Sequence, residues 1–343
     1  MNTLKATLLT NEYPPYIYGG AGVHVEYLSR ALAKLIPVEV RAFGDQNVHE
    51  ANLDIYGYQG WDFLKGPSDY KHLKVLQTMA TDLAMVKKPI EGGVVHVHTW
   101  YACWAGFLAR ELYRTPLVVT VHSLEPLRPW KEEQLGTAYR VSTWLEKNAI
   151  TSADRVIAVS KEMKEDVVKC YQVDADKVRV IYNGIDLAQY RFDERKDALQ
   201  KYGLKGDDYV LFVGRLSRQK GIADLVDAAA LLPEDIKFLL CTGTPDTSEL
   251  LAEFERKTRG KKNIIWLNYM LPREEVIQLY SHARLFACPS IYEPFGLINL
   301  EAMACETPVV ATAVGGIKEV VVDGETGILV PPADAEALAG AIR

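Results

Sequence analysis

Residues 289–304, PSIYEPFGLINLEAMA, decide how this chain is organised. The apolar run 285–288 before them predicts a buried strand, and the residues after the loop predict a helix. Glu293 lies in the loop and Glu301 lies in the helix. A loop that places a carboxylate beside a helix N-terminus offers an acceptor for hydroxyl groups and free N–H groups for a phosphate. This arrangement suits a ligand with a sugar at one end and a diphosphate at the other.

Strand-like apolar runs alternate with segments of helical period along the whole chain, which is typical of parallel sheets with crossover helices. The predicted strands are residues 4–10, 38–43, 94–98, 117–121, 156–159 and 178–182, and then 210–213, 237–241, 263–267, 285–288, 309–312 and 327–330. A polar, charge-rich stretch separates the two series. We therefore expect an α/β protein with two doubly wound domains, residues 1–187 and 209–343, joined by a linker at 188–208. Ligands of such folds bind at the carboxyl ends of the strands, so we expect a cleft between the domains.

Composition excludes several classes of protein. The 343 residues are 48% hydrophobic and 24% charged, and the formal net charge of -6 argues against nucleic-acid binding. The N-terminus resembles no signal peptide, and the sequence has no apolar run of membrane-spanning length, so membrane association is not expected. Five cysteines occur without a CxxC pair and predict thiols in a reducing compartment. The expected location is the cytoplasm.

Residues 10–24, TNEYPPYIYGGAGVH, follow the first predicted strand. Gly19, Gly20 and Gly22 let the backbone approach a ligand closely, and the helix that begins here would point its N–H groups toward that ligand. The dinucleotide fingerprint GxGxxG is absent. A tight glycine turn without a ligand is the alternative. His24 lies in the first turn of the predicted helix and would face whatever binds there.

Histidines mark the ends of two neighbouring strands. His96 and His98 share one face of their strand, and such a pair can bind a metal. No carboxylate or cysteine with metal-ligand spacing lies nearby, so a polar strand end is the preferred interpretation and no metal site is predicted. Trp100 and Tyr101 follow and suit stacking on sugars, with core packing as the rival interpretation. His122 ends the next strand, where α/β folds place their chemistry.

Arg215 and Lys220 flank a turn at the first strand end of the second domain. The segment is not a Walker A loop, which requires GxxxxGK followed by Ser or Thr. Both cations can reach one anionic ligand, and the arginine can bind phosphate through two N–H groups. A solvated surface pair is the alternative. The strand-end position favours a role in anion binding.

Glu293 and Glu301 could in principle be the acid and base of a glycosidase. One lies in a loop and the other in a helix beside a phosphate-binding N-terminus. Their placement favours binding of sugar hydroxyls on either side of a diphosphate.

Four motifs together resemble the retaining glycosyltransferases of family GT4, which have the GT-B fold. These are the E-x7-E segment from Glu293 to Glu301, the turn from Gly214 to Lys220, the loop at 19–22 and the segment NGID at 183–186. Within that family, residues 10–28, 43–46 and 290–308 are similar to the actinobacterial-type glycogen synthases, including the α-maltose-1-phosphate synthases. The resemblance covers nearly the whole chain.

The resemblance implies roles for individual residues. Glu293 would hold hydroxyls of the donor sugar, and Glu301 would hold those of the ribose. Arg215 and Lys220 would neutralise the diphosphate leaving group, and His122 would lie by the reacting sugar. Of these, His122, Glu293, Arg215 and Lys220 are the expected catalytic residues. Further donor contacts are expected at Gly19, Gly20, Met270, Phe295, Gly296, Leu297 and Ile298, and acceptor-side contacts at His24, Trp100 and Tyr101.

The implied reaction is transfer of glucose, with retention, from ADP-glucose or UDP-glucose to the end of an α-1,4-glucan or to glucose-1-phosphate, without a metal or other cofactor. Alternatives are a GT4 enzyme with another acceptor, such as a sugar phosphate or lipid, a nucleotide-sugar epimerase on the same fold, and a non-catalytic sugar-binding protein. Family members continue beyond the point where this sequence stops. We therefore expect the C-terminal crossover helix of the GT-B fold to be missing.

Overall fold

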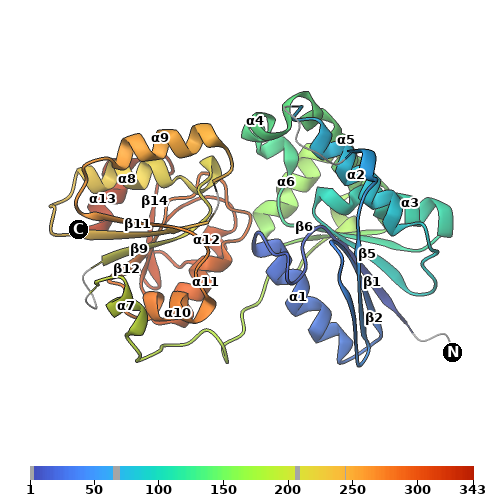
Figure 1. Cartoon of the computed structure of the whole chain (residues 1–343), viewed down its shortest axis with the longest axis horizontal. Coiled ribbons are helices and arrows are strands. Elements are labelled where there is room, and N and C mark those ends of the chain that lie inside the picture. The colour runs from blue at the N-terminus through green and yellow to red at the C-terminus, as the bar shows by residue number, and fades with distance from the viewer. Residues whose placement is uncertain (1–3, 65–69, 205–208, 244) are drawn as a thin grey trace. The chain divides into compact units, whose positions relative to one another are not determined.

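The structure is a computed structural model that describes residues 4–64, 70–204, 209–243 and 245–343 (Figure 1). The chain divides into two compact units, Met1–Tyr182 and Asn183–Arg343, called unit 1 and unit 2 below. Residues 188–208, expected to form a linker, fall in the range of unit 2, and their described part includes helix α7 (Asp197–Lys201). Within the described ranges, no helix combines the length and apolarity needed to cross a lipid bilayer.

Unit 1 contains an eight-stranded sheet in the order β3-β4-β2-β1-β5-β6-β7-β8. Its strands are β1 (Ala6–Thr10), β2 (Val38–Phe43), β3 (Asn47–Glu50), β4 (Leu53–Tyr58), β5 (Val94–His98), β6 (Leu117–Val121), β7 (Arg155–Ala158) and β8 (Val178–Val180). All neighbours pair in parallel except β3 and β4, which form an antiparallel hairpin. The chain runs from β1 outward through β2 and then returns to the other side of β1 at β5. The carboxyl ends of β1 and β5 therefore flank the position where α/β sheets bind ligands.

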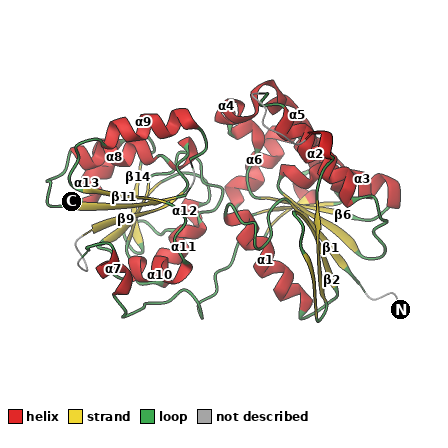
Figure 2. Ribbon diagram, in the orientation of Figure 1, coloured by secondary structure: helices red, strands yellow, loops and turns green. Residues whose placement is uncertain are grey.

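Helices cover both faces of this sheet (Figure 2). They are α1 (Gly20–Ala33), α2 (Leu73–Met85), α3 (Cys103–Tyr113), α4 (Glu132–Leu135), α5 (Tyr139–Ser152) and α6 (Lys161–Tyr171), with short 3₁₀ turns at Asp62–Leu64, Trp100–Ala102, Glu125–Leu127, Pro129–Lys131, Gly136–Ala138 and Ala175–Lys177. Val25 of α1 packs in one core cluster with Leu8 of β1 and Val40 of β2. Helix α3 lies so close to β5 that a Cβ on Gly106 would be 2.2 Å from Val97. Because alternate strand residues face opposite sides, β5 presents Val97 to α3 and its histidines to the side of α1.

Unit 2 contains a six-stranded parallel sheet in the order β11-β10-β9-β12-β13-β14. Its strands are β9 (Tyr209–Gly214), β10 (Lys237–Thr242), β11 (Ile264–Asn268), β12 (Leu285–Cys288), β13 (Val309–Thr312) and β14 (Gly327–Val330). Its remaining helices are α8 (Ile222–Ala230), α9 (Ser248–Thr258), α10 (Arg273–Ser281), α11 (Leu297–Ala304), α12 (Ile317–Val320) and α13 (Ala335–Ile342), with a 3₁₀ turn at Arg218–Lys220. The order reverses between β9 and β12, which makes their carboxyl ends the corresponding ligand-binding position.

Two hydrophobic clusters form the core of unit 2, one on each face of the sheet. Leu211 and Phe286 pack with residues of α7, α10, α11 and α12. Their strand neighbours Val210 and Leu285 pack with residues of α8, α9 and α13. Strands buried on both faces read as continuous apolar runs, which is why the sequence reveals them clearly.

The predicted α/β class with two parallel sheets is confirmed, and each predicted strand is present with ends shifted by at most two residues. The hairpin of β3 and β4 was not predicted. Strand β3 is exposed along its whole length, and β4 buries Leu53 and Ile55 while Asp54 and Tyr56 are only partly covered. A short polar edge strand has no apolar run by which to recognise it.

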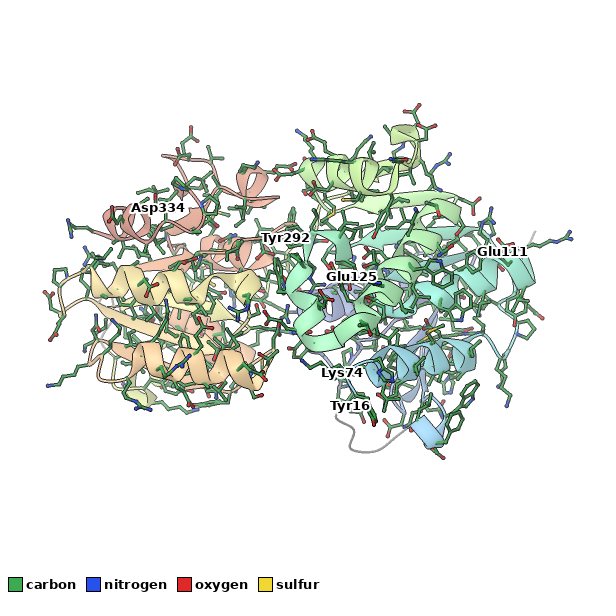
Figure 3. All side chains as sticks on the ribbon, turned by 90° about the horizontal axis from the view of Figure 1, so that it is seen from above. Tyr16, Lys74, Glu111, Glu125, Tyr292 and Asp334 are labelled. Atoms are coloured by element: carbon green, nitrogen blue, oxygen red, sulfur yellow. The ribbon has the colours of Figure 1, made fainter. Side chains whose placement is uncertain are left out.

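A carboxylate pair is buried in unit 1 beside the end of β6. Glu125, labelled in Figure 3, is fully buried and Glu146 of α5 is 4% exposed. The N–H of Glu125 donates to Oε2 of Glu146 at 2.8 Å, and the Tyr171 hydroxyl donates to the same oxygen. Burial, with the charge of Glu125 second, raises the pKa of Glu146 to about 8. Glu146 therefore keeps a proton in the folded protein that the unfolded chain releases at lower pH.

This proton makes the stability of unit 1 depend on pH. Because the folded state binds it more tightly, the free energy of unfolding should fall, by on the order of a few kcal/mol, as pH rises from the ordinary carboxyl pKa of 4.5 to about 8. Glu146→Gln should flatten that fall. Urea unfolding of both proteins between pH 5 and 8 measures the difference, and parallel curves would contradict the assignment.

Gly221, between Lys220 and α8, must be glycine for two reasons. Its φ is +60°, and a Cβ there would lie 1.9 Å from the carbonyl oxygen of Pro289 in the loop after β12. The turn after β9 is therefore packed directly against the loop after β12.

We expect Gly221→Ala to lower the free energy of unfolding by about 1–3 kcal/mol through backbone strain and this collision. Gly340→Ala is the matched control, because Gly340 lies in α13 and nothing lies within 4 Å of an added Cβ. The control should be neutral or stabilising by about 0.5–1 kcal/mol. Urea denaturation followed by circular dichroism measures both, and a Gly221→Ala protein as stable as wild type would refute the close packing.

Candidate functional site

The loop that carries Glu293 joins β12 to α11 and is anchored on both sides by its backbone. The N–H of Ile291 donates to the carbonyl of Gln219 at 2.9 Å, and the N–H of Gly316 donates to the carbonyl of Glu293 at 3.0 Å. Gly315 has a φ of +52°, and a Cβ there would lie 2.0 Å from that same carbonyl. The turns after β9 and β13 therefore hold the loop, and Glu293 is only 7% exposed.

Helix α11 begins beside this loop with an uncapped N-terminus. Its N-cap is Gly296, which has a φ of +95° and no side chain to accept from the first N–H groups. Phe295, Leu297 and Ile298, three of the predicted donor contacts, lie at this end. An open helix N-terminus attracts a negatively charged group, as expected for a diphosphate site.

Lys220 and Glu293 are in direct contact, which the sequence did not indicate. Lys220 Nζ donates to Glu293 Oε2 at 2.5 Å, and Ser290 Oγ donates to the same oxygen at 3.1 Å. The side chains of Lys220 and Glu293 are 14% and 9% exposed. Because an ion pair this buried loses much of its hydration, each partner holds the other in position. The residue predicted to bind phosphate and the residue predicted to bind sugar are therefore an ion pair in the structure.

Arg215 is held by a carboxylate that sequence reasoning missed. Its Nη1 donates to Oδ1 of Asp246 at 2.9 Å. Asp246 follows β10, the neighbour of β9, and its N–H donates to the carbonyl of Leu216 at 3.0 Å. The position of Asp246 after the predicted strand 237–241 was the signal in the sequence that could have revealed it. Arg215 and Lys220 lie at the ends of one short turn, but each has its own acidic partner.

Glu301 lies farther along α11, among tyrosines. The Tyr280 hydroxyl donates to Oε2 of Glu301 at 3.2 Å, and Tyr190 also bonds to the carboxylate. Burial raises the pKa of Glu301 above its ordinary value, against the opposing effect of these hydrogen bonds. Met270, one of the expected donor contacts, follows β11 and is 69% exposed. The roles of both residues stay predictions.

In unit 1, the glycine loop before α1 is fastened by Glu12, a second residue missed from sequence. Oε2 of Glu12 accepts from the N–H of Tyr18 at 2.9 Å and from that of Gly19 at 2.7 Å. A Cβ on Gly22 would lie 2.8 Å from the Cβ of Glu12, so the carboxylate needs that glycine. Gly20 is the first residue of α1. The position of Glu12 two residues after the first predicted strand was the available signal.

Histidines from α1, β5 and the end of β6 meet on the α1 side of the sheet. The ring centroid of His24 lies 4.7 Å from that of His122 and 5.5 Å from that of His98. His98 Nδ1 and His122 Nε2 are 3.1 Å apart, and His96 Nε2 is 2.7 Å from Thr120 Oγ1. The strand register explains the meeting, because His98 pairs with Thr120, two residues before His122.

Burial controls the charge of these rings. It lowers the pKa of His96 to about 3, and it holds the pKa values of His98 and His122 well below the ordinary value. Mutual repulsion among the histidines acts in the same direction. His96, His98 and His122 are therefore neutral at pH 7, able to donate or accept a hydrogen bond.

The aromatic pair after β5 packs against itself. Trp100 is 3% exposed, and its ring centroid lies 4.1 Å from that of the half-buried Tyr101. Thr99 precedes them with a φ of +66°, and its hydroxyl donates to Oδ1 of Asn11 at 2.8 Å. The buried indole thus contributes core packing, and an acceptor-side role for either ring stays a prediction.

Comparison with known proteins identifies the family of the chain. Residues 18–189 match the family model "Glycosyltransferase Family 4", and residues 194–343 match "Glycosyl transferases group 1". The chain is 44% identical over 338 residues to an α-maltose-1-phosphate synthase of Mycolicibacterium smegmatis, covering 95% of this chain and 84% of the relative. It is 28% identical over 366 residues to a glycogen synthase of Mycobacterium tuberculosis, covering 99% and 85%.

Among solved structures, a sucrose-phosphate synthase of Thermosynechococcus elongatus superposes with a TM-score of 0.79 at 28% identity, covering 99% of this chain and 88% of that one. Two family models thus cover the two units almost completely, and the relatives match across the boundary between them. The chain belongs to glycosyltransferase family 4 and is a glycosyltransferase of the GT-B fold.

Proposed function

We propose that this chain transfers glucose from ADP-glucose or UDP-glucose to glucose-1-phosphate and forms maltose-1-phosphate, with retention of configuration. The observation that carries the proposal is the 44% identity to an α-maltose-1-phosphate synthase along 95% of the chain. The weaker similarity to a glycogen synthase supports the end of an α-1,4-glucan as a second acceptor. The five free cysteines favour a reducing compartment, so we place the reaction in the cytoplasm.

The chemistry requires stabilisation of a leaving group more than it requires a nucleophile. The bond between C1 of glucose and the diphosphate oxygen breaks, and its electron pair goes to the diphosphate. The acceptor hydroxyl then bonds to C1 from the same face, while its proton passes to the departing phosphate. Charge develops on the diphosphate, where fixed positive groups stabilise the transition state most.

Unit 2 contains groups suited to that task. Lys220 and Arg215 supply positive charge, and the open N-terminus of α11 adds N–H donors. Glu293, held by Lys220, accepts from hydroxyls of the donor sugar in our proposal, and Glu301 accepts from those of the ribose. Because these two cations would neutralise the diphosphate, we propose that no metal ion is required.

Product analysis tests the proposal. The chain is incubated with each glucose donor and with glucose-1-phosphate, glycogen or water, and the nucleoside diphosphate and the sugar product are measured. We expect maltose-1-phosphate with glucose-1-phosphate, at a rate that EDTA does not reduce. Product with glycogen alone would favour the second acceptor. Epimerised nucleotide sugar, or binding without release of ADP or UDP, would refute glucosyl transfer.

Substitutions test the Lys220–Glu293 pair. Lys220→Met and Glu293→Gln should each lower kcat by about 10²-fold or more, since each removes a charge from the leaving-group and sugar contacts. Lys257→Met and Asp227→Asn are matched controls, because Lys257 and Asp227 form a 2.6 Å ion pair on the surface of the same unit. The controls should keep near-normal turnover. Unfolding midpoints verify that all four variants fold, and normal turnover in folded Glu293→Gln would refute its assigned role.

A further inference from the structure

Three histidines of unit 1 converge closely enough to bind one metal ion. His24, His98 and His122 each offer a ring nitrogen, and these nitrogens all lie within 4.8 Å of one another. They come from α1, β5 and the residue after β6, so three separate elements fix their positions. The sequence alone suggested a different and less favoured pair, His96 with His98.

The spacing fits tetrahedral coordination. Zn²⁺ bound by histidine has Zn–N distances of about 2.0–2.1 Å, which places ligand nitrogens roughly 3.3 Å apart. His98 Nδ1 and His122 Nε2 are already 3.1 Å apart. Only the side chain of His24, near the start of α1, would need to move closer to the other two rings.

One hydrogen-bonding atom of this histidine cluster has no partner among the residues that the structure describes. His98 is fully buried, and its Nε2 has no hydrogen-bond partner within the described ranges. Buried polar atoms are nearly always paired, so the described part of the protein alone does not satisfy the ring of His98. An ion bound through Nε2 would pair this atom, whereas an ion bound through Nδ1 would replace the contact between His98 and His122. His96 differs, because its Nε2 is 2.7 Å from Thr120 Oγ1 and is therefore occupied.

We infer that His24, His98 and His122 form a binding site for a divalent transition-metal ion of the Zn²⁺ type. Neutral imidazoles suit zinc, cobalt, nickel and copper, whereas Mg²⁺ and Ca²⁺ prefer oxygen ligands. Three protein ligands leave a fourth position open to water or to an oxygen of a bound substrate. The metal is not needed for the reaction.

The site has a consequence that rests on the proposed function. Since His122 is assigned to the reacting sugar and His24 to the acceptor side, an ion held by both residues competes with substrate. Micromolar to millimolar Zn²⁺ therefore inhibits glucosyl transfer, and EDTA restores it. Binding of the ion is independent of this assignment.

Metal binding is tested first, without any assay of activity. Chelator-treated protein is titrated with Co²⁺, whose visible spectrum reports tetrahedral coordination, and Zn²⁺ is then used to displace it. We expect about one equivalent per chain and no effect of excess Mg²⁺. His98→Gln and His24→Gln should each weaken binding at least about tenfold. If His98→Gln does not fold, as circular dichroism will show, His24→Gln carries the test.

Two other histidine variants are matched controls. His49→Gln removes an exposed histidine of unit 1 that pairs with Asp54, and His96→Asn removes a strand neighbour that is not a ligand. His49→Gln, and His96→Asn where it folds, should bind Co²⁺ within about twofold of wild type, because neither supplies a coordinating atom. Undiminished binding in folded His24→Gln or His98→Gln, or loss in His49→Gln, would overturn the site. Tight binding without inhibition of turnover would keep the site and refute only its overlap with substrate.

Discussion

Lys220 can reach Glu293 only because β9 and β12 are neighbours in the parallel sheet of unit 2. The two residues are 73 positions apart in the sequence. Strand β12 is inserted beside β9 on the side opposite to β10, so the turn after β9 and the loop after β12 open at the same edge. Gly221 and Pro289 then pack the two segments together without a side chain between them. The ion pair follows from this constraint.

Unit 1 repeats the arrangement with other chemistry. Strand β5 lies beside β1 on the side opposite to β2, and the edge formed by β1, β5 and β6 carries Glu12, His98 and His122. At the carboxyl ends of its strands, unit 2 has two cations and a helix without an N-terminal side-chain cap. Unit 1 has neutral imidazoles there, and a glycine loop that is hydrogen-bonded to Glu12. The two units share the strand order around their central strands but supply different groups there, because the fold sets where side chains gather and not which ones.

Most charged groups of the candidate site are held by the protein itself. Lys220 is bound by Glu293, Arg215 by Asp246, and the carboxylate of Glu12 accepts from two backbone N–H groups. Side chains held in this way lose little freedom when a ligand arrives. Such pre-organisation suits stabilisation of a developing charge, since the groups need not reorient during the reaction.

The sequence by itself determined the α/β class, the two sheets and most of the residues named for the site, because strands buried on both faces appear as apolar runs and strand ends are where such folds bind ligands. It could not determine which distant side chains touch. The pairing of Lys220 with Glu293, the support of Arg215 by Asp246 and the convergence of His24 with His98 and His122 depend on strand order, on register and on which face each residue occupies. Those properties arise only when the sheets assemble, so the tertiary structure decided them.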